Sequence, residues 1–233
     1  MNKVVLFSLF FLLFSGSVVF NIVDLTAQLK GQAFTLFLKV SEVKSIHEQF
    51  DLFDGKGYQF FVDHNHKMLD DPDDLVSIDS DFTLNNSKQF KLRKKAAEQF
   101  ELMAWAFSHD FKFKAKLSIN SAFRTHGFQK TLYYGCIANL CAEPWTSEHE
   151  LGLALDLWVN GQAIESNHGI YFKWMQDNAY KYGFHNTYQR GVAVDWFLVE
   201  KRHWRYVWVD LANYLHKIDK TFAEYFYSLY PKD

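Results

Sequence analysis

Three short polar motifs, far apart along the 233-residue chain, constrain its fold more than any other feature. They run from Ser121 to Arg124, from Ser147 to Asp156, and from Glu200 to Tyr206. Within them, His149, Asp156 and His203 offer two imidazoles and one carboxylate, the ligand set of a catalytic zinc that keeps a fourth position for water. A fold that serves this set must bring the three side chains to one point. We therefore predict that His149, Asp156 and His203 hold one zinc ion.

Alternation of side chains predicts how two of these ligands reach the site. A strand over 151–159 places four leucines on one face and Gly152, Ala154 and Asp156 on the other. The leucines would build core, whereas the small residues would leave room beside Asp156 for a metal and a substrate. A second alternating strand over 203–209 would deliver His203. The zinc site is therefore expected on the face of a sheet.

The rest of the chain alternates helices with short strands, which is typical of an α+β protein. Apolar residues that recur every three or four positions predict helices, and period-two runs predict strands. The predicted helices cover 91–108, the stretch from Thr125 towards Gly135, 170–182 ending at Gly183, and 211–230. Strands are predicted over 58–62 and 116–120, and a turn over 70–74. We expect a small antiparallel sheet flanked by helices.

The N-terminus has the pattern of a targeting segment. Lys3 precedes an apolar run over 4–14, small residues follow at 15–17, and a second apolar run continues to Val23. Residues 1–23 are therefore predicted to be either a cleaved signal peptide or a retained membrane anchor of about 20 residues. In both cases Lys3 on the cytoplasmic side predicts an extracytoplasmic location, in the periplasm or at the cell surface. We assign 24–45 as a tether and 46–233 as the folded domain.

The balance of charged residues excludes a nucleic-acid partner. The chain has 25 Lys and Arg against 27 Asp and Glu, with no long basic run, so it lacks the electrostatic footprint of a nucleic-acid-binding protein. Its length suits one catalytic domain, and we expect a monomer.

In an exported protein, Cys136 and Cys141 are candidates for a short disulfide loop that stiffens the segment before Ser147. Two free, partly buried thiols are the alternative.

On these residues, the chain resembles the VanY-type zinc D,D- and L,D-carboxypeptidases of peptidoglycan metabolism, over roughly Phe60 to Trp208. The family pattern is Ser-x-x-Arg with a Gln five residues after the Arg, then Ser-x-His-x-x-Gly-x-Ala-x-Asp, then Glu-x-x-His-Trp-Arg-Tyr. The matching residues here are Ser121, Arg124, Gln129, Ser147, His149, Gly152, Ala154, Asp156, Glu200, His203, Trp204, Arg205 and Tyr206. Trp145 stands where the family often has Gly, and Arg202 where it often has Trp. Both side chains are expected close to the metal, where they could narrow the cleft or add contacts.

The resemblance implies a zinc metallopeptidase that removes the C-terminal D-amino acid, D-alanine, from peptidoglycan stem peptides. Glu200 would take the proton of a zinc-bound water and pass it to the leaving amine. Arg124 would face the oxyanion or the substrate carboxylate. The resemblance also places Ser121, Ser147 and Gln129 at the peptide.

The residues themselves leave alternatives open. Arg124 could be a structural ion-pair partner, Ser147 a turn cap, and Gln129 a solvated side chain. A cell-wall-binding module with weak or no catalysis and a peptidoglycan endopeptidase are the alternative functions. The chain has all three ligands and Glu200, which argues against a pure binding module. An endopeptidase would need a cleft that is open at both ends. D,D and L,D specificity both suit the sequence, and other divalent ions suit the same ligands.

Overall fold

The structure is a computed structural model that describes residues 50–84, 89–164 and 169–231. The predicted signal peptide or anchor over 1–23 and the predicted tether over 24–45 lie outside these residues. Within the described part, no helix combines the length and the apolar character that crossing a membrane requires.

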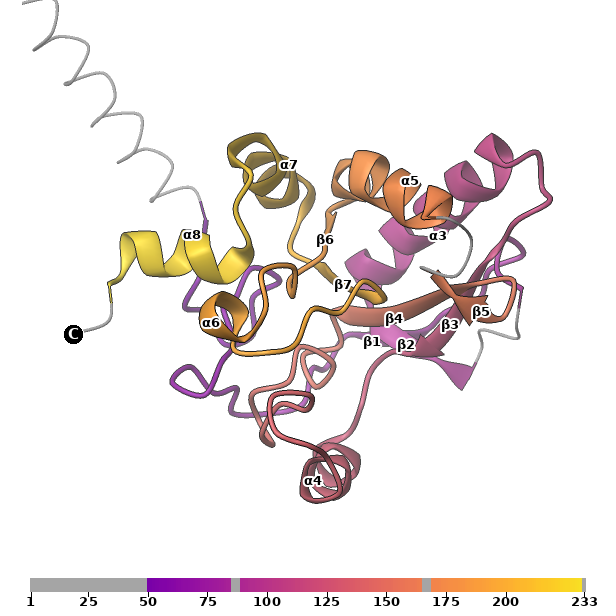
Figure 1. Ribbon diagram of the computed structural model, residues 1–233. Helices are drawn as coiled ribbons and strands as arrows, with labels where there is room; N and C mark the ends of the chain where they lie inside the picture. The colour runs from indigo at the N-terminus through magenta and orange to yellow at the C-terminus, as the bar shows by residue number, and fades with distance from the viewer. Residues whose placement is uncertain (1–49, 85–88, 165–168, 232–233) are drawn as a thin grey trace, which may run out of the picture. The chain divides into compact units, whose positions relative to one another are not determined.

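Two antiparallel sheets form the framework of residues 50–231 (Figure 1). The larger sheet has the strand order β3-β4-β7-β6, with β5 paired to β4. Its strands are β3 (Leu117–Ser121), β4 (Ala154–Val159), β5 (Gln162–Ala163), β6 (Phe184–His185) and β7 (His203–Tyr206). The smaller sheet pairs β1 (Leu75–Ser77) with β2 (Lys91–Arg93). The expected α+β class with a small antiparallel sheet is confirmed.

Helices flank the larger sheet. They are α3 (Lys94–Asp110), α4 (His126–Tyr134), α5 (Ile170–Asn178), the 3-10 helix η4 (Ala179–Tyr182), α6 (Val192–Asp195), α7 (Val209–Ile218) and α8 (Phe222–Leu229). Figure 1 shows α3 and α5 on one side of the sheet and α4 on the other. The polar motifs meet in the loops and strand ends around β4.

The hydrophobic core joins β4 to α3. Leu155 and Leu157 of β4 are fully buried, as are Phe100 and Phe107 of α3, and all four belong to one cluster. Burial of one such side chain contributes about 1.5–3 kcal/mol. Because side chains alternate along a strand, this packing turns Asp156 to the opposite face of β4.

The second motif is only partly a strand, so the prediction over 151–159 is corrected. β4 begins at Ala154, and the residues just before it form turns. Gly152 has a φ of 65°, in the left-handed region that glycine favours, and a Cβ there would lie 2.7 Å from Leu75 Cδ2. Gly152 therefore serves a tight turn against β1, and it does not leave room beside Asp156 as expected.

Two other strand predictions were also inaccurate. Residues 58–62 form a loop, in which Phe60, Phe61 and Val62 are all buried and the Phe61 N–H donates to Leu52 O at 2.9 Å. The strand predicted over 203–209 ends at Tyr206 because α7 begins at Val209.

Two predicted helices have different limits. Residues 91–93 of the predicted helix over 91–108 belong to β2, and α3 begins at Lys94. The single helix predicted over 211–230 is two helices, α7 and α8. Asp219, at φ 50°, ends α7, and a capping box of Thr221 and Glu224 begins α8.

Other local predictions are confirmed. The Thr125 hydroxyl accepts a hydrogen bond from the Phe128 N–H at 3.3 Å and caps α4. Gly183, at φ 82°, ends the helical stretch of α5 and η4. The strand predicted over 116–120 is β3, shifted by one residue. Cys136 and Cys141 form a disulfide, so the alternative of free thiols is wrong.

Candidate metal centre

Three buried side chains converge where β4 meets β7. His149 lies in the turn before β4, Asp156 lies within β4, and His203 is the first residue of β7. The strand register pairs Asp156 with His203, so their side chains are direct cross-strand neighbours. Asp156 Oδ2 is 3.5 Å from His149 Nε2, and Asp156 Oδ1 is 3.5 Å from His203 Nδ1. One ligand atom from each residue lies within 4.8 Å of the other two.

In each imidazole, the nitrogen that faces away from Asp156 makes a hydrogen bond, and this bond orients the ring. His149 Nδ1 lies 2.7 Å from the Ala122 carbonyl oxygen, which can only accept, so this nitrogen carries the proton. His203 Nε2 lies 2.7 Å from Glu148 Oε2. These bonds leave His149 Nε2 and His203 Nδ1 facing Asp156. Metal-binding histidines commonly donate their second N–H in this way.

Glu148 is a supporting residue that sequence reasoning missed. Its carboxylate also accepts from Arg205 Nη1 at 2.9 Å and from Thr187 Oγ1 at 2.7 Å. Burial raises the pKa of Glu148, but the Arg205 cation and the His203 bond outweigh that effect and hold the pKa at about 2. Both Glu148 and Arg205 lie inside the polar motifs, yet nothing in their spacing shows that they meet.

The donor set fits a zinc ion. Two imidazole nitrogens and one carboxylate oxygen form a three-ligand set that leaves a fourth position for another group. Asp156 Oδ1 is buried and accepts no hydrogen bond from the described residues. Burial disfavours the charged form of Asp156, but His149 and His203 more than compensate and lower its pKa well below the usual value. A buried anion of this kind is suited to a cation.

A pocket of about 280 Å³ opens beside this cluster, and Glu200 and Arg124 both line it. The Glu200 residue is only 8% exposed, and burial raises the pKa of its carboxyl. A carboxylate with a raised pKa suits a group that must accept and return a proton. Ser121 and Ser147 also line the pocket.

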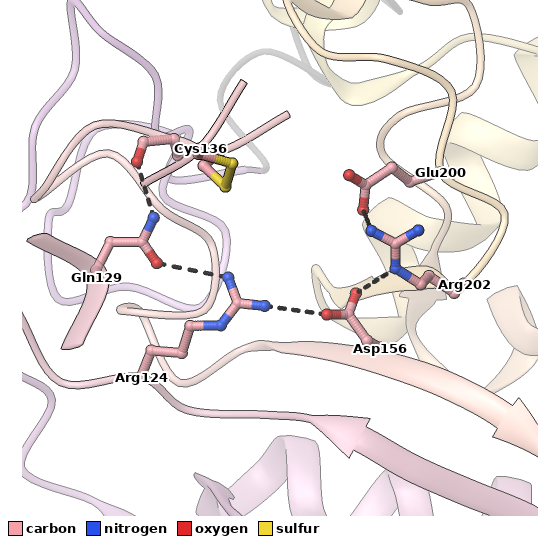
Figure 2. The surroundings of a disulfide bond; sticks show 8 residues. Arg124, Gln129, Cys136, Asp156, Glu200 and Arg202 are labelled. Carbon is pink, nitrogen blue, oxygen red and sulfur yellow. Dashed lines mark hydrogen bonds and ion pairs between the residues drawn. A yellow bond between two sulfur atoms is a disulfide. The ribbon is translucent and has the colours of Figure 1, made fainter. Parts of the chain in front are cut away.

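Arg124 lies between Asp156 and Gln129, a residue of α4 (Figure 2). Its Nη2 donates to Asp156 Oδ2 at 3.0 Å, its Nε to Ser121 Oγ at 3.0 Å, and its Nη1 to Gln129 Oε1 at 3.5 Å. Gln129 is fully buried and its Nε2 donates to the Ala142 carbonyl at 2.8 Å, so the alternative of a solvated Gln129 is wrong. Arg124 is an ion-pair partner that also faces the pocket.

Ser147 and Tyr188 each contact one histidine of the cluster. Ser147 Oγ accepts from the His149 N–H at 3.3 Å, which is the turn-capping contact considered from sequence. The Tyr188 ring stacks on the His203 imidazole with centroids 4.6 Å apart. Tyr188 also lines the pocket, and sequence reasoning did not identify it.

Comparison with known proteins places this fold and site in a family. The profile of VanY, D-alanyl-D-alanine carboxypeptidase, matches residues 89–209, which is more than half of the chain. This chain belongs to the VanY family. The matched range contains all three polar motifs.

Relatives and solved structures agree with membership of the VanY family. YodJ of Bacillus subtilis, which is named as a carboxypeptidase, is 29% identical over 212 residues, covering 85% of this chain and 75% of YodJ. A D-alanyl-D-alanine carboxypeptidase of Enterococcus faecalis is 33% identical over 85 residues, covering 36% of this chain and 31% of that protein. The LdcB LD-carboxypeptidase structure has a TM-score of 0.65 at 28% identity, covering 74% of this chain and 87% of LdcB. A VanY D,D-pentapeptidase solved with Zn(II) shares the fold, with a TM-score of 0.58 at 20% identity and coverage of 73% and 99%.

The two departures from the VanY family pattern differ in their consequences. Trp145 has a φ of 70°, which explains why glycine suits this position. Its ring stacks on His126 at 4.1 Å and is not among the residues that line the pocket, so it does not narrow the cleft as expected. Arg202 does line the pocket. Its Nη2 lies 3.2 Å from Glu200 Oε2 and its Nε 3.9 Å from Asp156 Oδ1 (Figure 2).

Proposed function

We propose that this protein is a zinc-dependent carboxypeptidase that removes a C-terminal D-amino acid, D-alanine, from peptidoglycan stem peptides. One observation carries the proposal: a buried carboxylate, Glu200, and a guanidinium, Arg124, share one pocket with the cluster of His149, Asp156 and His203. Membership of the VanY family and the carboxypeptidase names of its relatives support the same reaction.

Each polar group of the pocket has a proposed task. Zinc, when bound by His149, Asp156 and His203, supplies Lewis-acid chemistry that makes water reactive near neutral pH. Glu200 accepts the proton of the attacking water and returns it to the leaving amine, a role that typically contributes on the order of 10²–10⁴-fold in rate. Arg124 binds the substrate carboxylate or the developing oxyanion, with Ser121 and Gln129 holding its guanidinium.

Arg124 favours removal of a terminal residue over internal cleavage. A guanidinium suits a terminal carboxylate, which the interior of a peptide lacks. We therefore prefer a carboxypeptidase to an endopeptidase, and a catalyst to a binding module. The protein would act as a monomer outside the cytoplasm, and the apolar segment after Lys3 would export it or tether it to the membrane.

Glu200→Gln in the full-length protein tests this function. The variant is expected to keep zinc and to lose about 10²–10⁴-fold in the rate of D-alanine release, because only the proton-transfer group is removed. Release from stem pentapeptides and tetrapeptides is followed by mass spectrometry, with a chelator and with zinc added back. His203→Ala is the control that loses both the metal and turnover.

The products decide between the candidate functions. Metal-dependent release of one terminal D-alanine supports the carboxypeptidase, and the preferred peptide length distinguishes D,D from L,D cleavage. Internal cleavage would identify an endopeptidase, and binding without turnover a wall-binding module. Full activity in Glu200→Gln would rule out the proposed mechanism.

A further inference from the structure

A second hollow adjoins the metal pocket. It has a volume of about 530 Å³, and Cys136, Cys141, Ala142 and Phe197 line both hollows. The disulfide loop between Cys136 and Cys141 forms one wall, and Trp196 with Phe197 forms another. The proposed reaction uses only the smaller hollow, so the larger one has no assigned role.

Exposed aromatic rings characterise this second hollow. Tyr133, Tyr134 and Trp196 line it, and Tyr134 is 76% exposed. The Trp196 ring meets the His64 imidazole edge-on, with centroids 4.7 Å apart. Aromatic side chains of this kind offer a flat apolar face together with a polar edge. Clustered exposed rings beside an active site mark a binding surface.

The charges of the hollow disfavour an ionic ligand. None of its described lining residues is Lys or Arg. Its two carboxylates are already engaged: Asp63 binds His66 and Tyr227, and Glu143 pairs with Lys67 at 3.3 Å. The side chains therefore suit a neutral ligand with flat apolar faces and hydrogen-bonding edges. A pyranose sugar has this chemistry.

The walls of the hollow are held in place before any ligand arrives. The disulfide closes the loop that carries Asn139, and the Leu198 N–H donates to the Asn139 carbonyl at 2.9 Å, which joins the two walls. Trp196, at φ 68°, is held in a conformation that side chains rarely adopt. A preorganised surface loses less free energy of ordering when it binds.

We propose that this hollow binds the sugar to which a peptidoglycan stem peptide is attached. The inference rests on the proposed function, because it assumes that the C-terminal end of that peptide occupies the metal pocket. With the terminal carboxylate at Arg124, the remainder of the substrate leaves the pocket past the shared residues Ala142 and Phe197. The sugar then stacks on Trp196 and Tyr134.

The test compares one stem pentapeptide with the same peptide attached to its disaccharide. The zinc-loaded parent should show a higher kcat/KM for D-alanine release from the sugar-bearing substrate. In Trp196→Ala and Tyr134→Ala this preference should fall by roughly five- to tenfold, as expected for the loss of one aromatic contact. Trp105→Ala removes a ring that is 47% exposed on α3 and does not line the hollow, and it should keep the parent preference.

A binding measurement separates this inference from the proposed function. The affinity of the disaccharide-peptide for the zinc-free protein requires no turnover, and it should fall in both hollow variants but not in Trp105→Ala. Unchanged preference and unchanged affinity in Trp196→Ala and Tyr134→Ala overturn the sugar site, whether or not D-alanine is released. Absence of release from both substrates overturns the proposed function alone.

Discussion

At the scale of single residues, the candidate metal centre depends on Glu148 as well as on the three candidate ligands. Glu148 accepts a hydrogen bond from His203 Nε2 and another from Arg205, whose side chain is fully buried. This carboxylate holds Nε2 of His203, so that Nδ1 faces Asp156 and can bind a cation once its proton is released. It also compensates the buried charge of Arg205, so it serves the metal site and the stability of the fold together.

Glu148→Gln should weaken zinc binding by about 10- to 100-fold, which is the usual effect of removing an outer partner of a ligand histidine. Zinc affinity is measured by competition with a chromogenic chelator. Because the change leaves Arg205 uncompensated, the free energy of unfolding should also fall.

The double variant Glu148→Gln with Arg205→Met separates the two effects. It should recover stability, since the uncompensated buried charge is gone, but it should not recover zinc affinity. Parent-like zinc affinity in a folded Glu148→Gln protein would show that the carboxylate does not support the metal.

At the scale of elements, the disulfide loop supports α4 and the guanidinium of the pocket. The Ala142 carbonyl, next to Cys141, accepts from Gln129 of α4, and Gln129 in turn accepts from Arg124 (Figure 2). Gln129 therefore connects the segment at the disulfide loop to Arg124 in the pocket. The loop is thereby linked to Arg124, the residue that we propose binds the substrate.

Replacing both cysteines, Cys136→Ser with Cys141→Ser, should raise KM for the peptide while zinc affinity stays unchanged. Arg124 would be held less firmly, whereas within the described part of the chain no hydrogen bond joins His149, Asp156 or His203 to the loop. The chain-entropy model gives a loss of roughly 2 kcal/mol in stability for so short a loop. Steady-state kinetics and a zinc titration check both parts.

A phosphine reductant, which lacks a zinc-binding thiol, provides the control for the disulfide prediction. It should raise KM of the parent to the level of the double serine variant and should leave that variant unaffected. An unchanged KM in both the reduced parent and the variant would disconnect the loop from Arg124.

At the scale of the whole molecule, the candidate metal site joins segments that lie far apart in the chain. The cluster takes one residue from the turn before β4, one from β4 and one from β7. An ion that binds all three stabilises the folded state, because the unfolded chain has no such site. Folding stability and metal occupancy are therefore linked.

Removal of zinc should lower Tm. At a free zinc concentration 100 times Kd, binding adds about 2.7 kcal/mol to stability, which for a domain of this size corresponds to roughly 5–10 °C. Calorimetry with and without a chelator measures the shift. His203→Ala should show no zinc-dependent shift, and an equal shift in that variant would place the stabilising ion elsewhere.

The motifs were enough to propose the chemical groups of the site and to predict where several helices begin or end. Two imidazoles, a carboxylate and Glu200 could be assigned from their motifs, and Thr125 and Gly183 marked helix ends. Each of these signals depends on residues that are close in sequence, so it can be recognised without knowing which other segments pack nearby. The strand limits around Gly152 and the division of 211–230 into two helices depended on packing and backbone angles that alternation does not report.

The contacts between buried groups could not be predicted from the motifs. Glu148 and His203 are 55 positions apart, and Gln129 lies 13 positions from the carbonyl that it binds. Side-chain type constrains what a group needs when it is buried, namely a compensating charge or a hydrogen bond. The partner that supplies it is chosen by how β4, β7, α4 and their connecting loops pack, and that choice is a non-local property of the folded chain.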